Sequence, residues 1–169
     1  KLDMSQSVAT LTTLSTPHHG SKMCRVLLKM PRFLQHIISF FLNVFYKIFG
    51  DKNPDFLTLA NELTDTYMKE FNEEVKNSEN VYYQSFSSNI DKRKMFFSYL
   101  PYKFSVYCEK ESTDGIVSLS SSKWGVYQGN IDGDFNHSEM IALYGSKKRI
   151  KRVSQFYYDI INVLIENGY

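Results

Sequence analysis

A chain of 169 residues is the size of one domain and long enough to bury a hydrophobic core. Apolar residues make up 43% and charged residues 22% of the chain, which is ordinary for a globular protein and excludes an intrinsically disordered one. The net charge is only +2, so nucleic-acid binding has no global electrostatic support.

The two ends and the two cysteines say little about where the protein works. No signal peptide is visible, but Lys1 has no preceding methionine, so we expect a processed product or a fragment and leave the localisation unknown. The C-terminus looks natural. Cys24 and Cys108 are too few for a disulfide framework, and the sequence leaves open whether they pair. Free thiols in a reducing compartment are the favoured interpretation.

The first predicted element is a buried strand. Residues 7–16 (SVATLTTLST) are β-branched and apolar, and the following Thr16-Pro17-His18-His19-Gly20-Ser21 has the composition of a turn. His18 and His19 have two interpretations, a polar loop at the end of the strand or a metal site. With no Cys or acidic residue nearby, the ligand spacing of a usable metal site is missing, so the loop is favoured.

An apolar, nearly uncharged helix is predicted next. Residues 33–46 (FLQHIISFFLNVFY) form a run of fourteen residues without a formal charge, shorter than the roughly 20 apolar residues that cross a bilayer. Three interpretations stay open from composition: a buried core helix, an interfacial helix, or a mobile cover over a pocket.

The middle of the chain predicts packed elements without chemistry. A helix is expected from Asn53 as N-cap and Pro54 as first residue, with apolar residues at steps of three and four from Phe56 to Val75. A short strand follows at 81–86. Residues 92–103 mix lysines with aromatic residues, as single-stranded nucleic-acid sites do, but a loop or short helix packed on the sheet is favoured.

Two residues at element boundaries are the candidates for chemistry. Asp114 stands in a tight Thr113-Asp114-Gly115 turn after an apolar segment, and His137 directly precedes a run that reads as helix. An Asp ahead of a His is the order in which α/β-hydrolases supply the last two members of a Ser-Asp-His triad. Asp114 would orient the imidazole and balance its charge, and His137 would be the general base. An ordinary turn and a surface histidine are the plainer alternatives.

The remaining motifs add no cofactor. Three serines at 120–122 do not lie in G-x-S-x-G, the elbow that presents a nucleophile, and that pattern is absent from the chain. Asp132 and Asp134 look like half of a calcium loop but cannot show the six to eight oxygens that calcium needs, so no metal is predicted. The basic run 147–152 favours a solvated turn over a site for anionic lipid head groups. An amphipathic helix over 153–164 closes the chain.

Two blocks resemble those of a known family. STDGIVSLSSSKWG and NHSEMI are similar to the acid and histidine blocks of the α/β-hydrolase triacylglycerol lipases, which include bacterial secreted lipases and fungal and plant relatives. Those lipases typically carry N-D-G-[LV]-V-S-x-x-S-[AS]-x-[WF]-G and then [ND]-H-x-[DE]; Thr113 replaces the usual Asn. LTTLSTPHHGS also resembles their [TS]-[TI]-[GS]-T-P-H-x-G-S segment, in which His18 and His19 would shape the loop.

The resemblance runs from Ser7 to about Leu164 and implies an α/β fold. It describes residues 1–169 as the C-terminal portion of one α/β-hydrolase domain with a helical lid insertion at 24–50. The lid would carry an apolar inner face that a lipid surface could expose: Phe40, Phe41, Val44, Phe45 and Ile48.

The same resemblance implies a lipase or esterase that hydrolyses carboxylic esters such as triacylglycerols. The family's oxyanion loop and nucleophile elbow would lie upstream of Lys1, so the partners implied are an N-terminal segment with the nucleophile, an ester substrate and a lipid–water interface. Half of such a sheet would expose a strand edge, and we expect the segment alone to be inactive. The alternative is a non-catalytic binding or regulatory piece that retains the hydrolase fold.

Overall fold

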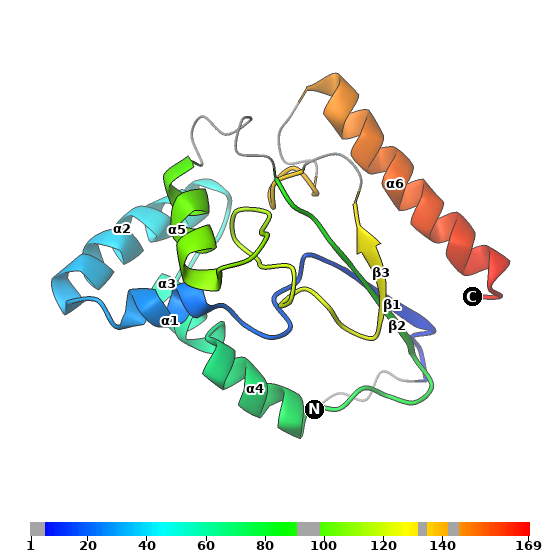
Figure 1. Ribbon diagram of the computed structural model, residues 1–169, viewed down its shortest axis with the longest axis horizontal. Coiled ribbons are helices and arrows are strands. Elements are labelled where there is room, and N and C mark those ends of the chain that lie inside the picture. Colours follow the sequence, from blue (N-terminus) through cyan, green and yellow to red (C-terminus); the bar gives the residue numbers. More distant parts are fainter. Residues whose placement is uncertain (1–5, 91–98, 132–134, 142–145) are drawn as a thin grey trace. The chain divides into compact units, whose positions relative to one another are not determined.

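The computed structural model describes residues 6–90, 99–131, 135–141 and 146–169, which divide into two compact units. The sheet unit comprises the chain up to His18 and residues 76–169, and the helical unit comprises residues 19–75. Figure 1 shows the strands and helices of both units along the sequence. Each unit is described by itself below.

The sheet unit contains a three-stranded parallel sheet in the order β1 (Thr10–Leu14), β2 (Tyr82–Ser87) and β3 (Val126–Asn130). β1 and β2 confirm the two predicted strands. β3 was not predicted, because its sequence VYQGN holds one apolar and one aromatic residue among polar ones. Because the strands are parallel, their carboxyl ends lie at one edge of the sheet, where polar side chains of α/β proteins usually gather.

A glycine fixes the approach of the chain to β3. Gly125 has a φ of +55°, and a Cβ added there would lie 2.3 Å from the carbonyl oxygen of Tyr83 in β2. The preceding residue, Trp124, donates its backbone N–H to Ser85 Oγ (2.8 Å). Only glycine has both the conformation and the space that this close crossing over β2 requires.

Helix α6 (Lys147–Glu166) runs beside the strands and completes the core of this unit (Figure 1). Val153 on α6 is buried with Ile131, Phe135 and Met140, and Phe156 packs edge-on against Phe86 of β2 at 5.1 Å. The helix confirms the predicted closing helix but starts earlier. Its N-cap is Ser146, so the basic run 147–152 forms the first turns of α6, and the prediction of a solvated turn is wrong.

Helix α5 (Tyr99–Glu109) lies between β2 and the Asp114 turn in the chain. Its Tyr102 and Val106 pack against Ile90, which follows β2. The predicted loop or short helix at 92–103 is helical from Tyr99 onward, and residues 91–98 lie outside the described part of the chain. The apolar segment before Asp114 therefore lies in a helix.

The helical unit consists of four helices: α1 (Lys22–Leu28), α2 (Arg32–Ile48), α3 (Phe56–Glu62) and α4 (Asp65–Glu74). α2 confirms the predicted apolar helix. The predicted helix after it differs in two respects. Asp55 caps α3 through a hydrogen bond from the N–H of Thr58, so Asn53 is not the N-cap. The helix also breaks at Thr64, whose hydroxyl accepts from the N–H of Tyr67 and starts α4.

The break has a physical reason that apolar spacing does not reveal. The Thr64 backbone is extended, and its hydroxyl bonds both the carbonyl of Asn61 and the N–H of Tyr67, replacing helical bonds with capping bonds. The extended Thr64 forms a parallel bridge with Ser21, and Ser21 N–H donates to Leu63 O (2.7 Å). Arg25 of α1 pairs with Asp65 of α4 at 3.2 Å. The helical unit is thus tied together at residues 21–25 and 63–65.

Helix α2 exposes most of its apolar side chains. Phe40, Phe41 and Ile48 are 63%, 67% and 76% exposed, and the buried residue of this helix is Ser39. Among the described residues, no helix has both the length and the apolar character needed to span a bilayer.

Candidate active site

Asp114 is held in a tight turn that leaves one carboxylate oxygen for another partner. Its Oδ1 accepts the backbone N–H groups of Ile116 (3.0 Å) and Val117 (2.8 Å), while its own N–H donates to Val117 O (3.2 Å). Gly115 supplies the φ of +103° that lets the chain turn back. The side chain is almost fully buried, at 1% exposure. These bonds fix the direction of the carboxylate independently of His137.

Thr113 replaces the Asn that the resembling lipases typically carry, and it still serves the turn. Its hydroxyl accepts the N–H of Gly115 (3.1 Å), the same kind of bond that an Asn side chain makes two residues ahead. The hydroxyl also contacts Ser105 Oγ of α5 (3.1 Å), and Thr113 bridges Ser118 across the turn. The turn is therefore anchored to α5.

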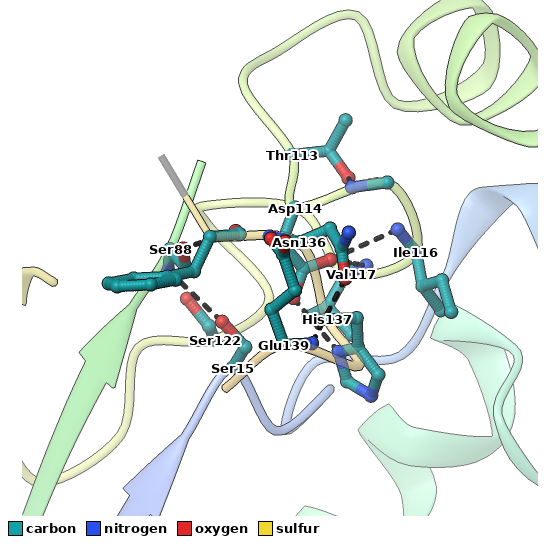
Figure 2. Close-up of polar contacts among 12 residues, drawn as sticks. Ser15, Ser88, Thr113, Asp114, Ile116, Val117, Ser122, Asn136, His137 and Glu139 are labelled. Atoms are coloured by element: carbon teal, nitrogen blue, oxygen red, sulfur yellow. Dashed lines mark hydrogen bonds and ion pairs between the residues drawn. The ribbon is translucent and has the colours of Figure 1, made fainter. Parts of the chain in front are cut away.

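His137 meets the remaining oxygen of Asp114. Its Nδ1 lies 2.8 Å from Asp114 Oδ2, and its backbone N–H donates to Asp114 O at 3.2 Å (Figure 2). The two residues are 23 positions apart in sequence, and the fold brings them together at both backbone and side chain. The Asp114 side chain is inaccessible, whereas the His137 side chain is 36% exposed.

The contact fixes the protonation pattern of the ring. An ionised carboxylate only accepts hydrogen bonds, so Nδ1 carries the proton and, in the neutral ring, Nε2 carries the lone pair. Burial lowers the pKa of His137, but the hydrogen bond to Asp114 and its negative charge raise it by more, so the pKa lies above its usual value. The site holds an accessible nitrogen base, backed by a buried carboxylate.

The carboxyl ends of β1 and β2 support the segment that carries His137. Ser15, which follows β1, accepts the backbone N–H of Ser88 (3.0 Å), and Ser88 Oγ donates to Phe135 O (2.6 Å) (Figure 2). Ser15 has a φ of +42°, an uncommon conformation for a residue with a side chain. These supporting serines were not predicted: Ser15 lies in the LTTLSTPHHGS block but carries no signal for this contact, Ser88 lies in no motif, and their contacts span 73 and 47 positions.

The turn after His137 is not helical where it is described. Residues 137–141 form a turn, so the expected helix directly after the histidine is wrong for them, and residues 142–145 lie outside the described chain. Asn136 N–H donates to Glu139 Oε2, and Glu139 N–H donates to Asn136 Oδ1, both at 3.0 Å. This reciprocal pair has the form of a capping box, and the N–H groups of Glu139 and Met140 also donate to Asn136 O at 3.0 and 3.3 Å.

The five residues predicted for the lid lie elsewhere in the chain from the acid–base pair. Phe40, Phe41, Val44, Phe45 and Ile48 all belong to α2 of the helical unit and are all exposed. Asp114 and His137 belong to the sheet unit. The role of the five as a lid stays a prediction.

The other candidate residues have packing contacts. His18 bonds Thr13 Oγ1 through Nε2 (3.0 Å) and stacks on Trp124 at 5.1 Å, in keeping with its expected role in shaping the loop. Cys24 and Cys108 are both buried and are not joined in a disulfide. Within the described residues, no cluster of three His, Cys, Asp or Glu side chains could hold a metal ion. Asp132 and Asp134 lie outside them.

The chain is similar to known proteins in sequence and in fold. No family model matches the chain. Over 144 residues the chain is 30% identical to triacylglycerol lipase 2 of Saccharomyces cerevisiae, and the match covers 79% of the chain. The chain spans 37% of the length of that relative.

Two solved structures are also similar. A metagenomic carboxyl esterase matches with a TM-score of 0.59 at 14% identity, over 82% of this chain and 39% of that one. A Bacillus licheniformis lipase in its mature form matches with a TM-score of 0.47 at 22% identity, over 79% and 49%. The first match shows the fold, and the curated relative shows the sequence kinship. The chain is a triacylglycerol-lipase-like segment with part of the α/β-hydrolase fold.

Proposed function

We propose that this chain supplies the acid and the base of a serine hydrolase that cleaves carboxylic esters of lipids, acylglycerols among them. The observation that carries the proposal is the contact between His137 Nδ1 and the buried Asp114 carboxylate, with the imidazole edge left accessible. The similarity to a triacylglycerol lipase and to an esterase fold supports the same reaction class.

In the proposed reaction, a serine hydroxyl attacks the ester carbonyl carbon while His137 Nε2 accepts its proton. The resulting imidazolium is stabilised by Asp114, whose two backbone hydrogen bonds keep the carboxylate in place. The imidazolium then protonates the leaving alkoxide and an acyl-enzyme remains. Water, deprotonated by His137, attacks the acyl group, and the collapse of that intermediate frees the acid and returns the proton to the serine.

The nucleophile is proposed to come from a segment that precedes residue 1 in the full-length protein. The sequence given contains no G-x-S-x-G, and it corresponds to about a third of the lipase it matches. On this proposal the chain is the C-terminal part of one α/β-hydrolase domain. It lacks the nucleophile and the oxyanion donors, so alone it would be inactive.

The helical unit is proposed to serve the substrate rather than the chemistry. Residues 24–50 would form a lid whose α2 offers Phe40, Phe41, Val44, Phe45 and Ile48 to a lipid–water interface. The support is their exposure, which is unusual for so many large apolar side chains on one helix.

A fluorophosphonate probe tests the triad directly, because it labels only a serine activated by a base. The full-length protein would be labelled and digested, and the modified peptide identified by mass spectrometry, for the wild type and for His137→Ala. His36→Ala, which removes a histidine from α2, is the matched control. We expect labelling of a serine upstream of residue 1 that His137→Ala abolishes and His36→Ala leaves intact.

Two outcomes would contradict the proposal. Label on a serine within residues 1–169 would place the nucleophile in this chain and overturn the assignment of roles. A folded full-length protein without any label would favour the alternative, a hydrolase fold kept for binding or regulation.

A further inference from the structure

The turn that carries His137 is fixed in shape by its own residues. Asn136 and Glu139 exchange two hydrogen bonds of 3.0 Å, one from each backbone N–H to the other side chain. Such a reciprocal pair sets the local backbone of a turn. It does not set the direction in which the turn points, which needs a contact to another element.

Arg149 of α6 provides that contact. Its Nη2 donates to Glu139 Oε2 at 2.5 Å, the same oxygen that accepts the N–H of Asn136. The guanidinium carbon also lies 5.2 Å from the ring centre of Phe135. Arg149 thus contacts the residue two positions before His137 and the residue two positions after it.

The burial of this pair makes its orientation costly to change. Glu139 is 8% exposed, and the Arg149 side chain is about one quarter exposed at 26%. A carboxylate removed from water needs a nearby positive charge, and separation from Arg149 would leave Glu139 without that charge while the N–H of Asn136 stays bonded to it. The pair therefore holds one arrangement.

The position of Arg149 along α6 points to the same conclusion. A cation in the first turn of a helix is disfavoured by the partial positive charge of the free N–H groups there, and α6 has no acid of its own in that turn. Glu139 supplies the missing negative charge from outside the helix. α6 itself is held by Val153 in the buried core and by Phe156 against Phe86.

We propose that Glu139 and Arg149 are positioning residues, which fix the His137 turn to α6 and so direct the imidazole toward Asp114. The segment 135–139 is then held at three places: Ser88 after β2, the backbone of Asp114, and Arg149 on α6. The catalytic consequence rests on the proposed function, whereas the geometric one does not.

The test uses the full-length protein with four single variants. Arg149→Met removes the guanidinium and keeps an apolar stem on Phe135, and Arg149→Lys keeps the charge but loses the planar fork. Glu139→Gln keeps an acceptor for Asn136 and loses the charge. Arg152→Met is the matched control, because Arg152 lies on the same helix and over the same Phe135 ring, at 5.7 Å.

Two readouts separate positioning from general stability. The first is the imidazole proton and nitrogen NMR spectrum, in which the Nδ1–H bond to Asp114 gives a resonance of its own. The second is the split between kcat and KM. We expect Arg149→Met and Glu139→Gln to lose or broaden the Nδ1–H resonance and to lower kcat about tenfold to a hundredfold, with KM nearly constant. Arg152→Met should keep both.

The double variant Glu139→Gln/Arg149→Met should be no worse than Arg149→Met alone, because both changes break one contact. If Arg149→Met does not fold, Arg149→Lys and Glu139→Gln decide. An unchanged resonance and unchanged kcat in those two would overturn the proposal.

Failure of the proposed function looks different. A wild-type protein that hydrolyses no ester, but whose Nδ1–H resonance disappears in the variants, would refute the hydrolase and keep the positioning role. An active wild type whose variants keep both resonance and kcat would refute the positioning role alone.

Discussion

The two units of this protein use polar and apolar side chains in opposite ways. The sheet unit buries Ser85, Ser105, Thr113 and Asp114 to 1% exposure or less, and its hydrogen bonds account for each of them. The helical unit instead leaves the phenylalanines of α2 in solvent and buries a serine there. Buried polar groups need fixed partners, and large exposed apolar patches usually mark a surface that meets another one. The first unit fixes its polar side chains by buried hydrogen bonds, whereas the second presents an exposed apolar face on α2.

The largest expected effect is on the pair of Asp114 and His137. His137→Ala should lower kcat for ester hydrolysis by about four orders of magnitude, and Asp114→Asn by a similar factor, because the base or its orientation is lost. His36→Ala, the corresponding change in the helical unit, should leave kcat unchanged. Steady-state kinetics on a soluble ester, with thermal unfolding to verify folding, measure the contrast. Full activity of His137→Ala would contradict the role of His137 as the base.

Two glycines with positive φ test how tightly each unit is packed. Gly125→Ala in the sheet unit would push a Cβ to 2.3 Å from Tyr83 O and should cost roughly 3 kcal/mol of stability. Gly50→Ala in the helical unit meets nothing within 4 Å, so the cost should be only the backbone strain of about 1 kcal/mol. Urea unfolding compares them. Equal losses would mean that the close crossing at Gly125 relaxes without cost.

The pH dependence follows from the raised pKa of His137. Burial works against the charged imidazole, but the hydrogen bond and charge of Asp114 raise the pKa above 6.5. The base must be neutral, so kcat/KM should fall about tenfold per pH unit below that raised pKa. Asp114→Asn removes both raising causes and should move this limb to lower pH in whatever activity remains. If the acidic side of the kcat/KM profile stays at the same pH in Asp114→Asn, a group other than His137 causes it.

The same pKa gives a stability effect of the opposite sense. Because the folded pKa is raised, the pair stabilises the fold fully below about pH 6.5 and loses this contribution as pH rises through the folded pKa. The pair is therefore least stabilising at the pH where its base is available. Thermal unfolding of the wild type and Asp114→Asn across this window should show the difference shrinking with pH.

The smallest expected effect concerns the exposed face of α2. Phe41→Gln with Ile48→Gln should change the free energy of unfolding by no more than about 0.5 kcal/mol per residue, because both side chains already lie in solvent. Hydrolysis of emulsified acylglycerol should fall several-fold, while hydrolysis of a dissolved short-chain ester stays constant. Lys47→Gln, on the same helix, is the control. Equal losses on both substrates would remove the interfacial role.

The elements that the sequence predicted best are those with a strong local pattern. β1, β2, α2 and the closing helix α6 each carry a continuous apolar or amphipathic run. β3 was missed because five mixed residues have no clear period, and its place is decided by pairing with β2. A single helix was expected from Phe56 to Val75 because the apolar residues keep helical spacing across Thr64. The backbone of Thr64 is extended, however, and the helix ends before it and begins again after it.

Only those residues of the candidate site that lie in a recognisable motif could be predicted from the sequence. Asp114 and His137 were predicted from their order, their turns and the resemblance, and the structure brings them within 2.8 Å of each other. Their catalytic role remains a prediction. Ser88 and Arg149 carry no local signal, since their contacts to the histidine turn depend on how β2 and α6 fold around it.

The bridge between Ser21 and Thr64 has a consequence for how this protein can change. It closes the chain from α1 to α3 into a loop whose two ends meet, and Gly20 lies so close to Thr64 that a Cβ there would be 2.6 Å from its carbonyl oxygen. A segment with adjoining ends can be shortened, lengthened or exchanged with little effect on the path of the chain outside it. Residues 22–63 can therefore be replaced as one unit, provided that Gly20, Ser21 and Thr64 are kept.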